Sequence, residues 1–490
     1  MRLSIERQST KIYPDMKRVV ARFFYNGEPR AKGIIQQVLD MTDAEADIII
    51  TPILREFSKR HRNITRIFER HCDKLKNLFT SMKIDMSSLS YKRRLLIGSY
   101  FTNEYSIESA AFFNPSIVED VDQSGLEEGE KRVIISFRAV GEGHVSSIVF
   151  RRGLIDKNNI VSFVPSGSYV DEPDIIRNSI YQKSIFFQNA VSIKLPDAVM
   201  KEVQDKLPDN FEYVALKQVI REMQQRYQID HLLKKGLERL LWLADSYYEI
   251  NFSLDTDISD RVIFPYSDAE SRGIEDARFV RYTNEKGEVR FYATYTAFDG
   301  ITIQPKLLET RDFYHFNIMP LYGEGAANKN LALFPRKING KYAMLSRIDG
   351  INNYIMYSDK INIWEKPQIL QTPRYPWEFV QIGNCGSPIE TEEGWLLITH
   401  GVGPMRTYCI GASLFDLDNP QKEIGRLRQP LILPNKDERE GYVPNVLYSC
   451  GSMVNNDVLI IPYGLSDYAS GFANVPLSKL LNKIKEDGLG

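Results

Sequence analysis

The sequence predicts a mainly β fold, in which a β-propeller is joined to helical regions. Short runs of β-branched and aromatic residues are separated by Gly, Asn, Asp and Pro turns, a pattern that is typical of antiparallel sheets. Four or five clusters of such runs follow at intervals of roughly 50 residues, and the long crossover helices of a parallel α/β fold are missing between them. A β-sandwich with long loops is the competing prediction.

Two regions of the chain are expected to be helical. Residues 1–100 form an N-terminal helical region, in which Thr42 and Glu45 have the spacing of a capping box. Residues 166–248 form a helical insertion, because their apolar residues recur at helical rather than alternating spacing.

The strands are expected on both sides of that insertion. Residues 101–165 hold the first part of the propeller, and residues 249–490 hold the remainder. The clearest strand-like runs are residues 133–137, 289–294, 342–345, 354–357, 395–399, 408–414 and 458–462.

Composition excludes several classes of function. Lys and Arg number 62 against 64 Asp and Glu, so a net charge of -2 gives no field that favours nucleic acid or an anionic membrane. The N-terminus lacks the continuous apolar core of a signal peptide, and no run approaches the length of a membrane span. The four cysteines are widely scattered without metal-type spacing. We therefore expect a cytoplasmic protein with no metal site.

An acidic turn carries the strongest chemical signal. Residues 273–278 read Gly-Ile-Glu-Asp-Ala-Arg and precede an aromatic strand-and-turn run at residues 291–300. Two adjacent carboxylates beside a guanidinium can place one acid at a reaction centre while Arg278 holds the other. Such an arrangement suits sugar chemistry, where a carboxyl group protonates a leaving oxygen. A surface ion pair beside a turn is the alternative that these residues alone leave open.

Several separated segments carry a family pattern, and their order and spacing are more specific than any one of them. They are residues 113–116 (Phe-Asn-Pro-Ser), 136–139 (Ser-Phe-Arg-Ala), 273–278, 333–338 (Leu-Phe-Pro-Arg-Lys-Ile), 394–402, 410–417 and 441–446. Together they resemble glycoside hydrolase family 130, the mannoside phosphorylases and related mannosidases. The resemblance covers about residues 105–165 and 250–475, and it implies a five-bladed β-propeller.

The resemblance implies a general acid at Asp276, which matches the proton donor of the family's Gly-x-Glu-Asp-Pro-Arg motif. Family enzymes are thought to relay that proton through the sugar's own 3-hydroxyl. Ala277 stands where the motif usually has Pro, which frees the backbone but removes no reacting group.

The resemblance also implies a phosphate pocket formed by Lys329, Arg347, His400 and Tyr408. Relative to the family, the Lys and Arg identities are exchanged, which keeps the charge but changes the donor geometry. His400 follows a strand-like run and precedes Gly401, which places its imidazole near a strand end, where it can donate to an anion; a structural histidine is the alternative reading. Arg406 is a further candidate cation.

Sugar binding is assigned to polar and aromatic side chains, which accept hydroxyl hydrogen bonds or pack on a ring. By the resemblance, Asn114, Arg138 and Asp467 line the mannosyl subsite. Less specific candidates, each also readable as a residue of the fold, are Glu275, Arg278, Tyr295, Asp299 and Tyr442.

The leading functional prediction is an inverting β-mannoside phosphorylase that uses inorganic phosphate as co-substrate, needs no cofactor, and gives α-mannose 1-phosphate. Its substrate would be a mannobiose, a manno-oligosaccharide or a mannosyl-glucose. The alternative is an inverting β-mannosidase, which needs a second carboxylate to activate water; the candidates are Glu324, Glu378, Glu390 and Glu440. A non-catalytic glycan-binding propeller is a third reading. The helical regions are expected to offer surfaces for homo-oligomerisation.

Overall fold

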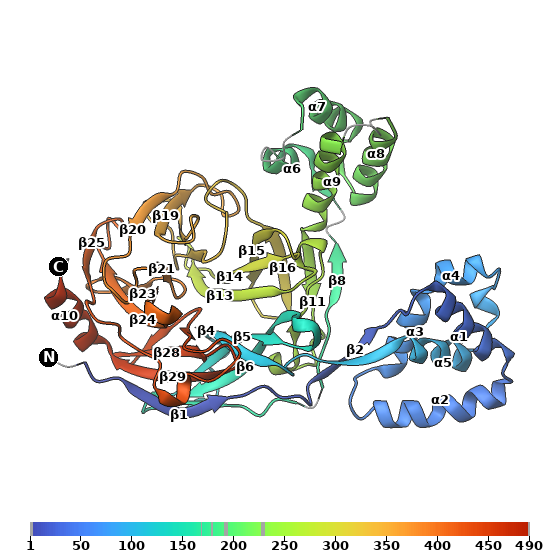
Figure 1. Cartoon of the computed structure of the whole chain (residues 1–490), viewed down its shortest axis with the longest axis horizontal. Helices are drawn as coiled ribbons and strands as arrows, with labels where there is room; N and C mark the ends of the chain where they lie inside the picture. The colour runs from blue at the N-terminus through green and yellow to red at the C-terminus, as the bar shows by residue number, and fades with distance from the viewer. Residues whose placement is uncertain (1–2, 168, 178–179, 191–194, 227–230, 489–490) are drawn as a thin grey trace.

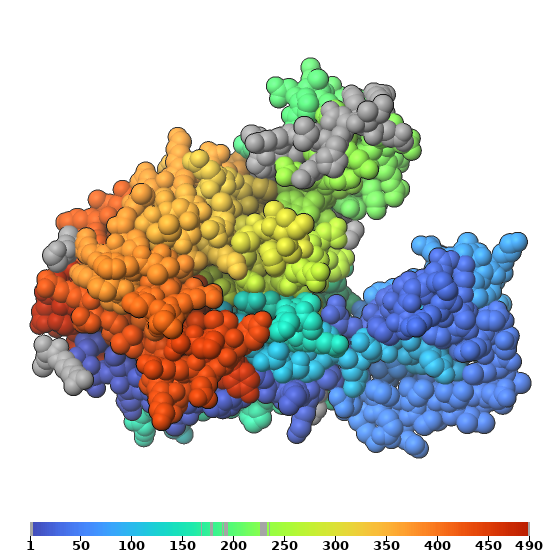
Figure 2. Space-filling model, in the orientation of Figure 1, coloured from blue at the N-terminus to red at the C-terminus, as the bar shows by residue number. Residues whose placement is uncertain are grey.

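Antiparallel sheets make up most of the computed structural model, which describes residues 3–167, 169–177, 180–190, 195–226 and 231–488. Figure 1 shows these sheets as one large body, with helices at one side and a second helical group above it. In the space-filling view the two helical groups project from the sheets as separate lobes (Figure 2). The mainly β class is therefore confirmed.

Five of the sheets have four to six strands each, and we number them in chain order of their first long strand. Sheet 1 contains β4 (Ala111–Glu119), β5 (Lys131–Val140), β6 (Ser146–Ile155), β7 (Val161–Phe163) and β12 (Val262–Ile263). Sheet 2 contains β13 (Ile274–Thr283), β14 (Val289–Phe298), β15 (Ile303–Thr310), β16 (His315–Pro320), β11 (Tyr248–Asn251) and β8 (Asp174–Arg177).

The other three sheets follow the same antiparallel order. Sheet 3 contains β17 (Ala332–Leu333), β18 (Tyr342–Ser346), β19 (Asn353–Ser358) and β20 (Gln368–Gln371). Sheet 4 contains β21 (Gln381–Asn384), β22 (Ile389–Thr391), β23 (Gly394–Val402), β24 (Tyr408–Phe415) and β25 (Glu423–Arg426). Sheet 5 contains β26 (Leu447–Tyr448), β27 (Met453–Asn455), β28 (Val458–Leu465), β29 (Ala469–Pro476) and β1 (Glu6–Ile12). All seven runs predicted as strands lie in these sheets.

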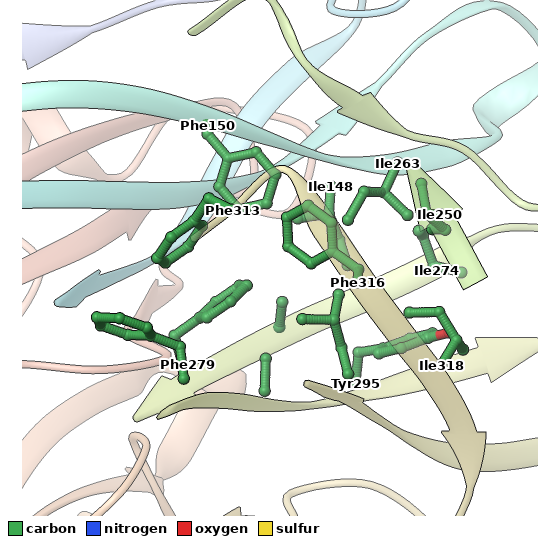
Figure 3. Close-up of a cluster of buried hydrophobic side chains, with 14 of the residues drawn as sticks. Ile148, Phe150, Ile250, Ile263, Ile274, Phe279, Tyr295, Phe313, Phe316 and Ile318 are labelled. Atoms are coloured by element: carbon green, nitrogen blue, oxygen red, sulfur yellow. The ribbon is translucent and has the colours of Figure 1, made fainter. Parts of the chain in front are cut away.

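Each sheet contacts the next one, and sheet 5 contacts sheet 1. The contacts run from β4 to β13, from β14 to β17, from β18 to β21, from β24 to β26, and from β28 back to β4. A separate buried apolar cluster fills each of these five interfaces. Figure 3 shows the cluster between sheets 1 and 2, where Phe150, Phe279 and Phe316 lie together. This order supports the predicted five-bladed propeller, which stays a prediction.

The N-terminal part of the chain differs from a purely helical region. Its helices are α1 (Glu28–Asp40), α2 (Asp43–Phe57), α3 (Ile64–Asp73), α4 (Lys76–Ser81) and α5 (Tyr91–Tyr100), and α2 begins with the predicted capping box. However, β1 pairs with β29 in sheet 5, and β2 (Val19–Phe23) pairs with β3 (Thr102–Ser106). The polar sequence of β1 has no apolar run, so it gave no strand signal.

The insertion contains α6 (Lys183–Asn189), α7 (Asp197–Lys206), α8 (Tyr213–Arg226) and α9 (His231–Asp245), which share their own apolar cluster. Two short strands, β9 (Tyr181–Gln182) and β10 (Asn210–Phe211), pair beside them. The last predicted β region ends in a helix, α10 (Leu477–Asp487), which packs on sheets 4 and 5.

A buried ion pair stabilises the turn that leads into β13. Lys306 Nζ lies 3.0 Å from Glu270 Oε1, and neither side chain is exposed. Glu270 also accepts hydrogen bonds from the Tyr248 and Tyr295 hydroxyls, and its backbone carbonyl accepts one from Gly273 N. Tyr295, a candidate for sugar binding, therefore lies in this core network.

Replacing Lys306 by Met should destabilise the protein by about 3–5 kcal/mol, because it leaves the Glu270 carboxylate buried without a counter-charge. The double variant Lys306→Met/Glu270→Gln should recover part of the loss. Urea unfolding measures both, with Lys32→Met as control, because its pair with Glu28 is exposed. A loss below about 1 kcal/mol for Lys306→Met would contradict a structural role for the pair.

Candidate active site

Asp276 lies on a β-bulge at the start of β13. The register between β13 and β14 shifts between Glu275 and Arg278, and Asp276 has a positive φ of 56°. The turn before it needs Gly273, whose φ is 128° and whose added Cβ would lie 2.6 Å from Ser146 Oγ. The bulge forms with Ala277 in place of the family's proline. It turns the Asp276 side chain into a site where it is 8% exposed.

A second bulge in β4 brings Asn114 to the same place. The register between β4 and β5 shifts between Phe113 and Ser116, and Asn114 has a φ of 51°. Asn114 Nδ2 donates to Asp276 Oδ1 at 2.6 Å. Two residues 162 positions apart in sequence thus meet because neighbouring sheets carry matching bulges.

Cations surround the two adjacent carboxylates. Arg138 Nη2 donates to Glu275 Oε1 at 2.9 Å, and Lys329 Nζ donates to Glu275 Oε2 at 2.6 Å. Arg138 Nη1 also lies 3.8 Å from Asp276 Oδ1. Glu275 therefore bridges two of the predicted site residues.

The charge state of Asp276 follows from these neighbours. Burial alone would raise its pKa, but the positive charges of Arg138, Arg278 and Lys329, with the Asn114 hydrogen bond, lower the pKa below its ordinary value. In the free protein Asp276 is thus held as a carboxylate at neutral pH.

Arg278 is fully buried behind Asp276. Its Nη1 donates to the backbone carbonyl of Asp276 at 3.0 Å, and its Nη2 donates to the hydroxyl of Tyr448 at 2.6 Å. At 2% exposure, its guanidinium supports the bulge rather than facing solvent. The sequence left open whether Arg278 fixes the turn or binds sugar, and these contacts favour the first reading.

His400 and Arg347 form a second group. Arg347 Nη1 lies 3.0 Å from His400 Nε2, and His400 Nδ1 lies 3.2 Å from the carbonyl oxygen of Asn384. Burial, with the charges of Arg347 and Arg278, holds the pKa of His400 well below its ordinary value. A neutral imidazole protonated at Nδ1 fits both contacts. His400 thus accepts from Arg347 in the unliganded protein, and donation to an anion stays a prediction.

Tyr408 and Gly383 complete the surroundings of His400. The rings of His400 and Tyr408 are stacked with centroids 6.0 Å apart, and the Tyr408 hydroxyl accepts from Gln381. A Cβ on Gly383 would lie 2.3 Å from His400 Cε1, so the glycine leaves room for the imidazole. The structure thus brings together three of the four predicted phosphate ligands, Arg347, His400 and Tyr408.

Asp467 lies close enough to the acidic pair to be affected by its charge. Burial raises the pKa of Asp467 to about 6 from an ordinary 3.8; Arg138 opposes the rise, and the Asp276 carboxylate adds to it. Arg406, the further candidate cation, is exposed and also lowers this pKa. Asp467 thus belongs to the same electrostatic group as Asp276.

Asp467→Asn should stabilise the unliganded protein at pH 7 by about 1–3 kcal/mol. A folded-state pKa above the unfolded value means that the folded state holds the proton more tightly, so stability falls as pH rises from about 4 to about 6. The asparagine variant escapes that loss, and most of its advantage should disappear at pH 4. Urea unfolding at the two pH values measures it, and an equal difference at both would contradict the raised pKa.

Two other sugar-binding candidates lie apart from these contacts. The carboxylate of Asp299 accepts from Ile301 N, Thr302 N and the Thr302 hydroxyl, so it caps a hairpin turn. Tyr442 is 71% exposed and its ring faces His144. Neither side chain is hydrogen-bonded to Asp276 or paired with it, and sugar binding by them stays a prediction.

Sequence reasoning missed three neutral residues that connect the two groups. The Tyr448 hydroxyl donates to Asn330 Oδ1 at 3.3 Å, and its ring centroid lies 4.8 Å from that of His400. Asn330 and Asn384 exchange hydrogen bonds through each other's backbone carbonyl. The one signal in the sequence that could have pointed to them is that Asn330 directly follows Lys329, a predicted phosphate ligand.

A cavity of about 760 Å³ lies elsewhere on the five sheets and is lined by Ile117, Phe279, Arg281, Lys337, Glu390 and Ser452, among others. Ile117, Phe279 and Arg281 follow the bulges along β4 and β13, so the cavity is at the other end of those strands. Asp276 does not line it. Within the ranges that the structure describes, no group of three His, Cys, Asp or Glu side chains is arranged to hold a metal ion. In the same ranges, no helix combines the length and apolarity that crossing a bilayer requires.

A family model described as beta-1,4-mannooligosaccharide phosphorylase matches residues 218–486, which is more than half of the chain. The match begins in α8 and leaves out Asn114 and Arg138, which the fold nevertheless places beside Asp276.

Individual relatives agree with this match. A 1,2-beta-oligomannan phosphorylase from Thermoanaerobacter sp. is 35% identical over 220 residues, which cover 42% of this chain and 69% of that protein. A beta-1,4-mannooligosaccharide phosphorylase from Ruminococcus albus is 34% identical over 170 residues, 32% of this chain and 51% of that protein. A solved beta-1,2-mannobiose phosphorylase from Listeria innocua aligns over 78% of this chain and 93% of its own, at 21% identity and a TM-score of 0.46. The family-model match and the Thermoanaerobacter relative confirm the resemblance: the chain belongs to glycoside hydrolase family 130 and is an enzyme of that family.

Proposed function

We propose that the protein is an inverting β-mannoside phosphorylase built on a five-bladed β-propeller, which cleaves a β-mannosyl linkage with inorganic phosphate to give α-mannose 1-phosphate. The observation that carries the proposal is a buried carboxylate, Asp276, held on a bulge beside cations and connected through Arg278 and Tyr448 to the His400–Arg347 pair. An acid and a separate cationic group are the two parts that phosphorolysis needs.

In this proposal Asp276 is the proton donor, and its proton reaches the leaving oxygen through the sugar's 3-hydroxyl. Because its pKa is lowered in the free protein, Asp276 must gain a proton before it can act as the donor. A bound phosphate anion offsets the nearby positive charge, which raises the pKa of Asp276 and favours its protonated form. Phosphate thus prepares the acid as well as attacking the sugar.

Arg347, Lys329 and Tyr408 hold the phosphate, and neutral His400 orients Arg347 toward it. A guanidinium donates two parallel hydrogen bonds to an oxyanion, so fixing its plane matters. On the sugar side, Arg138, Asn114 and Asp467 hold mannosyl hydroxyl groups. The proton donor Asp276 thus lies in sheet 2, whereas His400 and Tyr408 lie in sheet 4.

The positions of the four glutamates considered as hydrolytic bases argue against hydrolysis and thus favour phosphorolysis. Glu378 is fully buried and paired with Arg426 at 2.9 Å. Glu390 lines the cavity at the other end of the strands and pairs with Arg336. Glu324 is exposed and accepts from Lys366 N, and Glu440 is exposed on a loop.

The test is an incubation with β-1,2-mannobiose, β-1,4-mannobiose and β-mannosyl-glucose, each with and without phosphate, followed by identification of the products. We expect mannose 1-phosphate only when phosphate is present, and the fastest of the three substrates defines the linkage. Release of free mannose as the sole product, independent of phosphate, would instead identify a β-mannosidase. No turnover of any β-mannoside would sink both readings.

A further inference from the structure

Tyr448 lies between the two parts of the site, namely Asp276 with its neighbouring cations and the His400–Arg347 pair. It lies in β26, in sheet 5, while Asp276 lies in sheet 2 and His400 in sheet 4. Its side chain is buried, with 8% exposure. Its hydroxyl accepts from Arg278 Nη2 at 2.6 Å and donates to Asn330 Oδ1 at 3.3 Å. One phenol thus bonds to sheet 2 and to the segment before sheet 3.

Toward the acid, Tyr448 acts through Arg278. The guanidinium donates one hydrogen bond to Tyr448 and another, at 3.0 Å, to the backbone carbonyl of Asp276. Asp276 has a φ of 56°, a conformation that a non-glycine residue keeps only when its surroundings hold it. Fixing Arg278 therefore helps to fix the direction of the Asp276 carboxylate.

Toward the cations, Tyr448 acts on His400 by two routes. Its ring centroid lies 4.8 Å from that of the imidazole. Its hydroxyl also holds Asn330, which exchanges hydrogen bonds with Asn384, whose carbonyl oxygen lies 3.2 Å from His400 Nδ1. His400 in turn contacts Arg347 at 3.0 Å. Movement of Tyr448 would shift the imidazole and the guanidinium together.

We propose that Tyr448 is a positioning residue that fixes the Asp276 carboxylate relative to the His400–Arg347 pair. The proposal rests on the phosphorylase function proposed above, because it concerns the distance between the proton donor and the phosphate ligands. In this proposal Tyr448 acts through Arg278, Asn330 and His400 rather than by binding a substrate. A misplacement of reacting groups by about 1 Å can lower the rate by about 10²-fold without loss of binding.

The test compares Tyr448→Phe with Tyr181→Phe. Tyr181 lies in the helical insertion, is buried to the same degree at 7% exposure, and donates its hydroxyl to the carbonyl of Ala244 at 2.9 Å. We expect Tyr448→Phe to lower kcat by about 10–100-fold and to change the KM values for mannobiose and phosphate by less than about threefold. Tyr181→Phe should keep the kcat of the wild type, even if its Tm falls as much as that of Tyr448→Phe.

Arg278→Lys breaks the same connection from its other end and keeps the buried charge. We expect a similar loss of kcat, and we expect Tyr448→Phe to add less than about twofold to it, because both variants remove one link. If Tyr448→Phe does not fold, a kcat of Arg278→Lys within about twofold of the wild type overturns the inference. If Tyr448 had only a structural role, the kcat losses of Tyr448→Phe and Arg278→Lys would multiply in the double variant.

The inference is overturned if Tyr448→Phe keeps kcat within about twofold of the wild type, or if its loss multiplies with that of Arg278→Lys. The proposed function fails by a different result, namely phosphate-independent release of mannose by the wild type. In that case the comparison of Tyr448→Phe with Tyr181→Phe runs on hydrolysis, and its kcat ratio still decides the role of Tyr448.

Discussion

Asp276→Asn should lower turnover of β-mannobiose by about 10²–10⁴-fold, which is the range for loss of a general acid. The asparagine has the same shape and keeps an oxygen that accepts from Asn114, so the bulge is preserved. The variant loses the proton that the leaving sugar needs. Steady-state phosphorolysis measures the effect, and circular dichroism and Tm establish that the fold is intact.

A substrate with a good leaving group separates loss of the acid from general damage. A p-nitrophenyl β-mannoside needs little protonation, so Asp276→Asn should lose far less activity on it than on mannobiose. Asp416→Asn is the matched control, because its carboxylate accepts from backbone N–H groups in a distant turn. Turnover of mannobiose by Asp276→Asn at more than about a tenth of the wild-type rate would place the acid elsewhere.

Arg347→Met should raise the KM for phosphate by about 10–100-fold, the equivalent of losing a hydrogen bond to a charged group. The KM for mannobiose should change little, because the sugar contacts are assigned to Asn114, Arg138 and Asp467. Initial rates over a matrix of both substrate concentrations measure the two constants.

Conservative and distant variants sharpen this prediction. Arg347→Lys keeps the charge but loses the paired donors, so its KM for phosphate should lie between those of the wild type and Arg347→Met. Arg336→Met removes an arginine that pairs with Glu390 at the other end of the strands, and it should leave the KM unchanged. Equal phosphate KM values for Arg347→Met and wild type would remove Arg347 from the phosphate site.

The strands were predictable because their residue types report on burial. Runs such as residues 133–137 and 395–399 consist mostly of β-branched or apolar residues, and they form the buried centres of β5 and β23. The strand β1 was not predictable, because its polar side chains become part of a sheet only by pairing with β29 at the opposite end of the chain.

The site was predictable where charge and motif coincide. Asp276, Glu275 and Lys329 are named by the resemblance, and the structure places them in contact or near one another. Tyr448 and Asn330 carry no charge, and their importance comes from hydrogen bonds to residues 170 and 118 positions away. Such contacts depend on how separate sheets meet, which spacing along the chain does not report.

In the proposed reaction, phosphate rather than water attacks the mannosyl group. A ³¹P NMR time course with β-mannobiose distinguishes the two nucleophiles. We predict that the phosphate signal falls as α-mannose 1-phosphate appears, with one free mannose released for each, and that no mannose is released when phosphate is omitted. Release of mannose at an undiminished rate without phosphate, and no new phosphorus signal when phosphate is present, would show that water is the nucleophile.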